Sequence, residues 1–217
     1  MDYNTFMDIV NNSVYFVQAV VAIYGTYCAV VILTRIQQKR FKTYDGQSQF
    51  LDVLEEPLAR GDFDAAQQIC EDDRRAIVQL GYMAIVNRKL GLAKVRDLVL
   101  DYFQREVLSD LERRLSGINI AIKTEPMLGL LGTVLGMMQA FGKLAVAESV
   151  KAEDLASDIS FALITTCVGL VIAIPLMFVL TAINVRMRAM QDLVANGLGR
   201  FFEIFQLGLA AGSRHRK

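Results

Sequence analysis

The chain contains three apolar runs, each long enough to cross a lipid bilayer as a helix. They lie at residues 14–34, 126–147 and 159–185 of a 217-residue sequence that is 53% hydrophobic. Aspartate, glutamate, histidine, lysine and arginine are absent from residues 14–34, 126–142 and 159–185. About 20 mainly apolar residues are enough to span the hydrocarbon core of a membrane. We therefore predict a membrane protein with three transmembrane helices.

Apart from Lys143 and Lys151 near the hairpin between the second and third runs, the basic residues that flank the runs lie on one side. They are Arg35, Lys39, Arg40 and Lys42 after the first run, Arg113, Arg114 and Lys123 before the second, and Arg186 and Arg188 after the third. The positive-inside rule then places the N-terminus outside and the C-terminus in the cytoplasm. The predicted order is an outer N-terminal segment (1–13), transmembrane helix 1 (14–34), a cytoplasmic helical domain (35–125), transmembrane helix 2 (126–147), an outer hairpin (148–158), transmembrane helix 3 (159–185), and a cytoplasmic C-terminal helix and tail (186–217).

The polar parts of the chain show helical rather than strand-like patterns. Asp62 precedes an acidic turn and is a plausible helix cap. Apolar residues recur at three- and four-residue intervals before the second run, at Leu111, Leu115, Ile118 and Ile122, and after the third, at Met187, Met190, Val194, Phe201 and Phe205. Such stripes are typical of helices that bury one face. We predict an all-α protein in which membrane helices continue into the cytoplasm.

Composition excludes several classes of function. The formal net charge is zero, which argues against nucleic acid as a partner. Cys28, Cys70 and Cys167 show no metal-ligand spacing and are read as reduced apolar side chains, and the single histidine is His215 in a basic tail. We therefore expect no metal and no cofactor. The sequence shows no nucleophile–base pair or phosphate-binding loop, so we do not expect an enzyme.

Small and hydroxyl residues occur where a simple membrane anchor would carry leucine. Gly132, Gly136 and Ala140 fall four residues apart, a spacing that lets helices approach closely in lipid. Thr133 lies among these glycines, and Thr166 lies beside Thr165 in the third run. A lone membrane threonine can simply bond back to its own helix. On facing helices, however, these hydroxyls would line an inner surface able to hold water or a proton donor.

Two prolines and one absence complete the pattern. Pro126 is expected to open the second membrane helix, where a missing N–H costs least. Pro175 lies inside the third, where it frees the carbonyl of Val171 and is expected to bend the helix, as a plain kink or to shape a pore. Proton carriers within membranes are normally ionisable groups. Because residues 14–34, 126–142 and 159–185 contain none, a conducting assembly would need a partner that contributes the carboxylate.

These motifs resemble those of the ExbB/TolQ/MotA family of proton-channel subunits, most closely ExbB and TolQ. The second run matches the family pattern at Pro126, Gly129, Leu130, Gly132, Thr133, Val134, Gly136, Met137 and Phe141. The third run matches at Ala162, Leu163, Thr166, Gly169, Leu170, Ala173, Ile174 and Pro175. The segment from Leu58 to Cys70 also looks like a cytoplasmic segment of the family, less specifically.

The resemblance implies a homo-oligomeric ring, a pentamer, in the bacterial inner membrane, with the N-terminus in the periplasm. It implies an ExbD/TolR-like single-span partner that supplies an intramembrane aspartate, and a TonB/TolA-like protein as a further partner. Thr133 and Thr166, with the adjacent Thr165, then line the proton pathway, while the matched glycines and prolines set helix packing and pore shape. The implied function is conversion of the proton motive force into work for TonB-dependent transport or a related envelope process.

The sequence departs from the family at one position. ExbB and TolQ commonly carry a glutamate where this chain has Phe161, and the nearest acid is Asp158, one turn earlier. Either Asp158 serves at the outer, proton-entrance side, or the chain works without such an acid, which we favour. Two alternative functions stay open at this point. One is a flagellar or gliding-type stator subunit, and the other is a non-conducting membrane scaffold that binds other proteins through its glycine faces.

Overall fold

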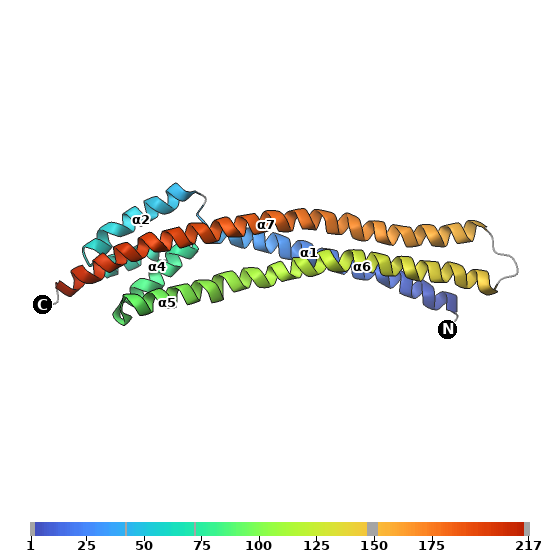
Figure 1. Ribbon diagram of the computed structural model, residues 1–217, viewed down its shortest axis with the longest axis horizontal. Helices are drawn as coiled ribbons and strands as arrows, with labels where there is room; N and C mark the ends of the chain where they lie inside the picture. The colour runs from blue at the N-terminus through green and yellow to red at the C-terminus, as the bar shows by residue number, and fades with distance from the viewer. Residues whose placement is uncertain (1–2, 42, 72, 147–151, 215–217) are drawn as a thin grey trace. The chain divides into compact units, whose positions relative to one another are not determined.

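The computed structural model describes residues 3–41, 43–71, 73–146 and 152–214, and these are 94% helical with no strand (Figure 1). The all-α prediction is confirmed. The elements are α1 (Tyr3–Lys39), α2 (Tyr44–Ala59), α3 (Phe63–Cys70), α4 (Ala76–Val86), the 3-10 turn η1 (Arg88–Leu90), α5 (Leu92–Tyr102), the π-helical segment η2 (Phe103–Leu108), α6 (Ser109–Val146) and α7 (Ala152–Arg214).

Three helices are long and apolar enough to cross a membrane, as the sequence predicts. The candidate spans fall within residues 13–39, 92–145 and 155–211. The first membrane segment lies in α1, the second in α6 and the third in α7. In the predicted outer hairpin, residues 152–158 already belong to α7, and residues 147–151 lie outside the described part of the chain.

The chain divides into two compact units. The first, the membrane unit, comprises residues 1–31 and 114–182. Its helices α1, α6 and α7 lie against one another: Tyr15 stacks edge-on against Phe161, with ring centroids 5.0 Å apart, and Gly25 fits between Ala121 and Leu176. Large apolar side chains face outward from this unit, including Phe16, which is 71% exposed, and Phe178, which is 72% exposed. An apolar outer surface is what a bilayer requires, and the protein is membrane-embedded.

The second unit comprises residues 32–113 and 183–217; most of these residues are predicted from the sequence to be cytoplasmic, and we call it the cytoplasmic unit after that prediction. Its core is built around two stacked rings of α7, Phe201 and Phe205, which are 5.6 Å apart and essentially fully buried. The apolar helix α4 lies against this core through Gly81, since a methyl group at Gly81 would lie 3.4 Å from the Phe201 ring. The predicted apolar stripe of the C-terminal helix is therefore confirmed as a buried face.

The helix cap that the sequence predicts in the second unit is also present. The Asp62 carboxylate accepts a hydrogen bond of 3.0 Å from the backbone N–H of Ala65, so Asp62 caps α3 as predicted. Gly91 adopts a φ of 86° at the start of α5, a conformation that favours glycine. Gly197 of α7 has a clear packing role, because a methyl group there would overlap the side-chain nitrogen of Gln47.

The position of Pro126 corrects one expectation. The proline was predicted to open the second membrane helix, but α6 begins at Ser109 and runs through Pro126 without interruption. The missing N–H therefore falls inside the helix, where it leaves the carbonyl of Ile122 without its usual donor. The start of an apolar run is not the start of a helix here, because the amphipathic segment from Leu111 to Ile118 is already helical and buried on one side.

Candidate functional site

A cluster of three threonine hydroxyls joins α6 to α7 within the membrane unit. The Thr133 hydroxyl on α6 and the Thr166 hydroxyl on α7 lie within hydrogen-bonding distance of each other. The Thr133 hydroxyl oxygen also lies 3.2 Å from the carbonyl oxygen of Ala162 and 3.1 Å from that of Gly129, and its single proton can be donated to one of these acceptors at a time. The predicted juxtaposition of Thr133 and Thr166 on facing helices is therefore observed, although the two residues are 33 positions apart in sequence.

The Gly129 carbonyl is the acceptor on which this cluster converges. The Thr166 hydroxyl lies 2.9 Å from this carbonyl oxygen and the Thr165 hydroxyl lies 3.1 Å from it. Thr165 also lies 2.7 Å from the Ala162 carbonyl and is only 1% exposed, whereas Thr133 and Thr166 are half-buried. Thr165 is thus enclosed between the helices, and the other two hydroxyls reach the edge of the helix pair.

Glycines make this approach possible. A methyl group on Gly129 would lie 2.8 Å from the Cα of Thr166, and one on Gly132 would lie 2.5 Å from the Thr165 hydroxyl oxygen. At Gly136 the added carbon would meet the Cβ of Ala162 at 2.6 Å. The glycine stripe predicted from the sequence is therefore the face of α6 that lies against α7 of the same chain, in the small-residue packing typical of membrane helices.

The cluster borders a shallow apolar hollow on the membrane unit, lined by Thr133, Val134, Met137, Met138 and Phe141. A hydroxyl can donate one hydrogen bond and accept two. At the edge of an otherwise apolar surface, Thr133 and Thr166 can therefore receive one further polar group, such as a water molecule or the carboxyl group of another helix. No titratable side chain belongs to this cluster, so it can position a proton carrier but not replace one.

The other predicted residues occupy separate places. Pro175 is exposed on α7, and α7 continues through it. Gly169 lies against the start of the second membrane segment, because a methyl group there would lie 2.5 Å from the carbonyl oxygen of Glu125. Gly169 thus belongs to the helix packing of the membrane unit, and the role of Pro175 in bending the helix or shaping a pore stays a prediction.

Asp158, the candidate acid for the proton-entrance side, is held in an ion pair. The Lys143 ammonium nitrogen lies 2.9 Å from Oδ1 and 2.7 Å from Oδ2 of Asp158. The Asp158 side chain is only 15% exposed. Phe161, at the position of the family glutamate, packs against Tyr15 of α1, and the Tyr15 hydroxyl lies 3.5 Å from its backbone carbonyl. An aromatic contact between α1 and α7 thus occupies the position at which ExbB and TolQ commonly carry a glutamate.

Sequence reasoning missed several buried polar residues of the membrane unit, among them Glu125 and Gln18. Glu125 is 0% exposed, and neither of its carboxylate oxygens has a hydrogen-bond partner within the described residues. Gln18 of α1 is 1% exposed and donates from its side-chain nitrogen to the carbonyl of Thr165, at 3.1 Å. The signal for Glu125 was available, since this acid directly precedes Pro126 at the edge of the apolar run. Glu125 lies one residue before the uncharged stretch of residues 126–142.

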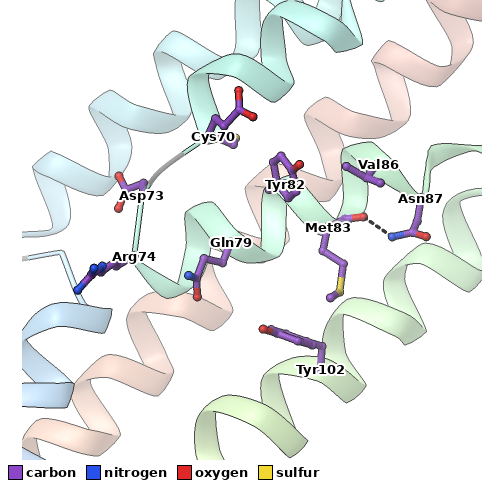
Figure 2. Close-up of a pocket in the computed structure, with 10 residues that line it drawn as sticks. Cys70, Asp73, Arg74, Gln79, Tyr82, Met83, Val86, Asn87 and Tyr102 are labelled. Carbon is purple, nitrogen blue, oxygen red and sulfur yellow. Dashed lines mark hydrogen bonds between the residues drawn. The ribbon is translucent and has the colours of Figure 1, made fainter.

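The cytoplasmic unit contains a hollow of about 580 Å³ between α3, α4 and α5. Figure 2 shows its wall, which includes Tyr82 and Met83 of α4 and Tyr102 of α5. Burial, helped by the neighbouring Asp73 carboxylate, raises the pKa of the Cys70 thiol to about 12, so the thiol stays protonated at neutral pH. Such a thiol is a poor nucleophile and a poor metal ligand.

Asp73, one of the acids that line this hollow, forms an ion pair with Arg75. Hydrogen bonds of 2.8 and 2.9 Å from the Nε of Arg75 hold the pKa of the Asp73 carboxyl below its usual range. Among the residues that the structure describes, no group of three or more His, Cys, Asp or Glu side chains could hold a metal ion. The hollow therefore offers a polar and aromatic surface, and we assign it no reaction.

Comparison with known proteins agrees with this geometry. Residues 76–196 match the model of the MotA/TolQ/ExbB proton channel family. The chain is 30% identical over 168 residues to the Tol-Pal system protein TolQ of Haemophilus influenzae, covering 75% of this chain and 67% of that protein. It is 29% identical over 164 residues to the biopolymer transport protein ExbB of Xanthomonas campestris pv. campestris, covering 74% of this chain and 60% of that protein.

A putative biopolymer transport protein ExbB homolog of Methanothermobacter thermautotrophicus is 29% identical over 157 residues, which cover 72% of this chain and 55% of that protein. The chain thus spans between about half and two thirds of the length of these relatives. The match with the family model includes α4, the threonine cluster and all of the second and third membrane segments. The chain belongs to the MotA/TolQ/ExbB proton channel family, and within it is most similar to ExbB and TolQ.

Proposed function

We propose that this protein is the channel subunit of a proton-driven energy-transducing complex in the bacterial inner membrane, not an enzyme. It forms a homo-oligomeric ring, a pentamer, around an ExbD/TolR-like single-span partner that supplies an intramembrane aspartate. Proton flow past the ring drives work in TonB-dependent transport or a related envelope process, with a TonB/TolA-like protein as a further partner. The N-terminus lies in the periplasm and the C-terminus in the cytoplasm, as the flanking basic residues indicate.

The observation that carries this proposal is the Thr133–Thr166 hydroxyl pair at the edge of an apolar hollow. Each run around it, residues 126–142 and 159–185, lacks an ionisable side chain that could carry the proton through. A carboxyl group brought by a partner helix would find its hydrogen-bonding groups here. Each charge that crosses a potential of 100 mV releases about 2.3 kcal/mol, so repeated transfers are enough to drive a conformational cycle.

The packing of the membrane unit favours a channel over a scaffold. A scaffold that binds other membrane proteins through its glycine face needs that face to be free. Here Gly129, Gly132 and Gly136 are already in contact with α7 of the same chain. The threonine hydroxyls, not the glycines, reach the edge of the helix pair. The names of the relatives with similar sequences, TolQ and ExbB, support the same choice over a flagellar or gliding stator.

Valine substitutions at the hydroxyl pair test the proposal. Valine has nearly the shape of threonine, so T133V and T166V remove the hydroxyl with little change in volume. We expect either variant, co-reconstituted with its single-span partner in liposomes, to lose most of the proton flux driven by a membrane potential. T166S should keep the flux, because it keeps the hydroxyl.

The matched control is Thr181→Val. Thr181 lies in the same membrane helix, is exposed, and donates only to the Met177 carbonyl of its own helix, at 3.0 Å. We expect T181V to conduct like the unmodified protein. Full proton flux and full downstream work in T166V would overturn the proposed role of the pair. Equal losses in T166V and T181V would show that the effect is structural rather than specific to the pathway.

A further inference from the structure

Among the residues that the structure describes, Glu125 is the one buried acid, and the proposed mechanism leaves it unused. It is completely buried and both carboxylate oxygens lack a partner. In a low-dielectric interior, an ionised carboxylate without hydrogen bonds or a counter-charge is far more costly than a neutral acid. Proteins meet this cost either by pairing the charge or by protonating the group.

The surroundings of Glu125 offer no counter-charge. On α7, its backbone carbonyl lies against Gly169, and that helix carries no charged residue between Asp158 and Arg186. On α1, residues 9–34 contain no charged side chain. On α6 itself, the nearest cation is Lys123, whose side chain is exposed.

Three tyrosines of α1, Tyr15, Tyr24 and Tyr27, are placed elsewhere, and Tyr27 is 60% exposed. Tyr15 lies at the carbonyl of Phe161, and the Tyr24 oxygen lies at Gly117, two turns of α6 away from Glu125. The polar group of α1 that does reach this region is the Gln18 amide, which lies 3.2 Å from the carbon that a side chain at Gly169 would add. The Gln18 side-chain oxygen has no hydrogen-bond partner either.

The position along α6 places Glu125 near one boundary of the membrane. Lys143, ion-paired to Asp158, marks the outer end of the second and third segments. Eighteen residues of α-helix separate Lys143 from Glu125, or about 27 Å at 1.5 Å per residue, which is close to the thickness of the hydrocarbon core. Glu125 is about 12 Å from Thr133 on the same axis, on the cytoplasmic side.

We propose that Glu125 is a proton-binding residue of this chain, held as a neutral acid among α1, α6 and α7 at the cytoplasmic end of the membrane segments. It releases its proton when the packing around Gly169 and Gln18 opens to water. This proposal rests on the proposed function for its place in the pathway. In that function, Glu125 receives protons on the cytoplasmic side of the threonine cluster, so the ring contributes a titrating group of its own.

Infrared spectroscopy distinguishes the two forms of the carboxyl group directly. The full-length protein, reconstituted alone in lipid bilayers at neutral pH, should show the carbonyl stretch of a neutral carboxylic acid. This band should be absent from E125Q, shifted in E125D and unchanged in D158N, because Asp158 is ion-paired. Spectra at rising pH should show the acid band replaced by carboxylate bands. E125Q should also unfold at the same or higher detergent concentration, because glutamine resembles the protonated acid in shape and polarity.

Two results would overturn the proposal. One is a carboxylate band at neutral pH that disappears in E125Q, together with a loss of stability in that variant, which would show an ionised and paired glutamate. The other is a carboxylate band that forms with sodium salts but not with a large organic cation, which would make Glu125 a metal-cation ligand instead. E125D keeps the test decisive if E125Q does not fold, because its own acid or carboxylate band reports the protonation state.

The outcome is independent of the proton-flux assay on the threonines. An acid band at Glu125 without proton flux in the co-reconstituted complex would retain the proton-binding residue and reject the channel function. Proton flux with an ionised Glu125 would retain the channel function and reject Glu125 as a proton-binding residue.

Discussion

Replacing Gly129 by alanine adds one methyl group at a close backbone contact between α6 and α7. The new carbon would lie 2.8 Å from the Cα of Thr166 and 2.9 Å from the carbonyl oxygen of Thr165. Carbon atoms in contact normally lie about 3.5–4.0 Å apart. Both neighbours are backbone atoms of a helix, which cannot rotate away, so the helices must separate locally by about 1 Å.

Three energy terms decide how far G129A changes the free energy of unfolding. Overpacking of this kind costs about 1–3 kcal/mol. Separation also weakens the hydrogen bonds from Thr165 and Thr166 to the Gly129 carbonyl, at about 0.6 kcal/mol for an average interhelical bond in a membrane. Alanine returns up to about 1 kcal/mol through its higher helix propensity. We therefore expect G129A to lower the free energy of unfolding of the membrane unit by about 1–3 kcal/mol.

The two buried cysteines allow each unit to be followed separately. Cys28 is buried in the membrane unit and Cys70 in the cytoplasmic unit, while Cys167 is exposed and would first be replaced by serine. A thiol-reactive dye is added during titration with a denaturing detergent. In G129A we expect Cys28 to react at a lower detergent concentration than in the parent protein.

The matched control is Gly199→Ala, since no atom lies within 4 Å of the carbon it would add. We expect this variant to leave the reactivity of Cys28 unchanged and to be neutral or slightly stabilising for its own unit. If Cys28 became reactive at the same detergent concentration in G129A and in the parent, the close helix contact would not be a constraint, and the packing argument for the glycine stripe would be wrong.

Three further predictions concern the cytoplasmic unit. F201A should destabilise it by about 3–5 kcal/mol, because Phe201 is 1% exposed and stacks on Phe205, and Cys70 should then react at lower detergent. The Cys70 thiol, with its pKa raised to about 12, should resist iodoacetamide in the native protein at neutral pH. Because the pKa of this thiol is higher in the folded than in the unfolded protein, the free energy of unfolding should fall as the pH rises from the ordinary thiol range toward about 12. Unfolding curves at alkaline pH would measure this fall. R200A should cost at most about 1 kcal/mol despite its contacts with Asp52 and Glu55, because the groups are partly exposed, and added salt should reduce even that difference.

The sequence alone predicts the helices and their buried faces. Three uncharged runs predict the membrane segments, and three- and four-residue periodicity predicts the buried stripes that contain Leu111 and Phe201. Asp62 is identified as a helix cap because a short polar side chain at that position satisfies a free N–H of the first turn. These features depend on residues that are close in sequence, which is why sequence patterns are enough to find them.

The candidate site is only partly predictable in this way. Thr133 and Thr166 are found as hydroxyls in unusual places, but which of the neighbouring threonines is enclosed depends on the register of α6 against α7. The structure encloses Thr165 and leaves the other two at the edge. A one-residue change of register would rotate a helix by about 100° and exchange these roles.

Glu125 shows the same limit most clearly. Its sequence position, at the end of a polar segment and before Pro126, is compatible with an exposed charge. Only the meeting of α1, α6 and α7 at Gly169 and Gln18 makes it a buried acid without a partner. Composition and periodicity thus determined that this chain is a three-span helical membrane protein. The tertiary contacts decided which polar groups lie together, because burial and pairing arise between residues that are distant in sequence, 33 positions apart for Thr133 and Thr166 and 147 for Gln18 and Thr165.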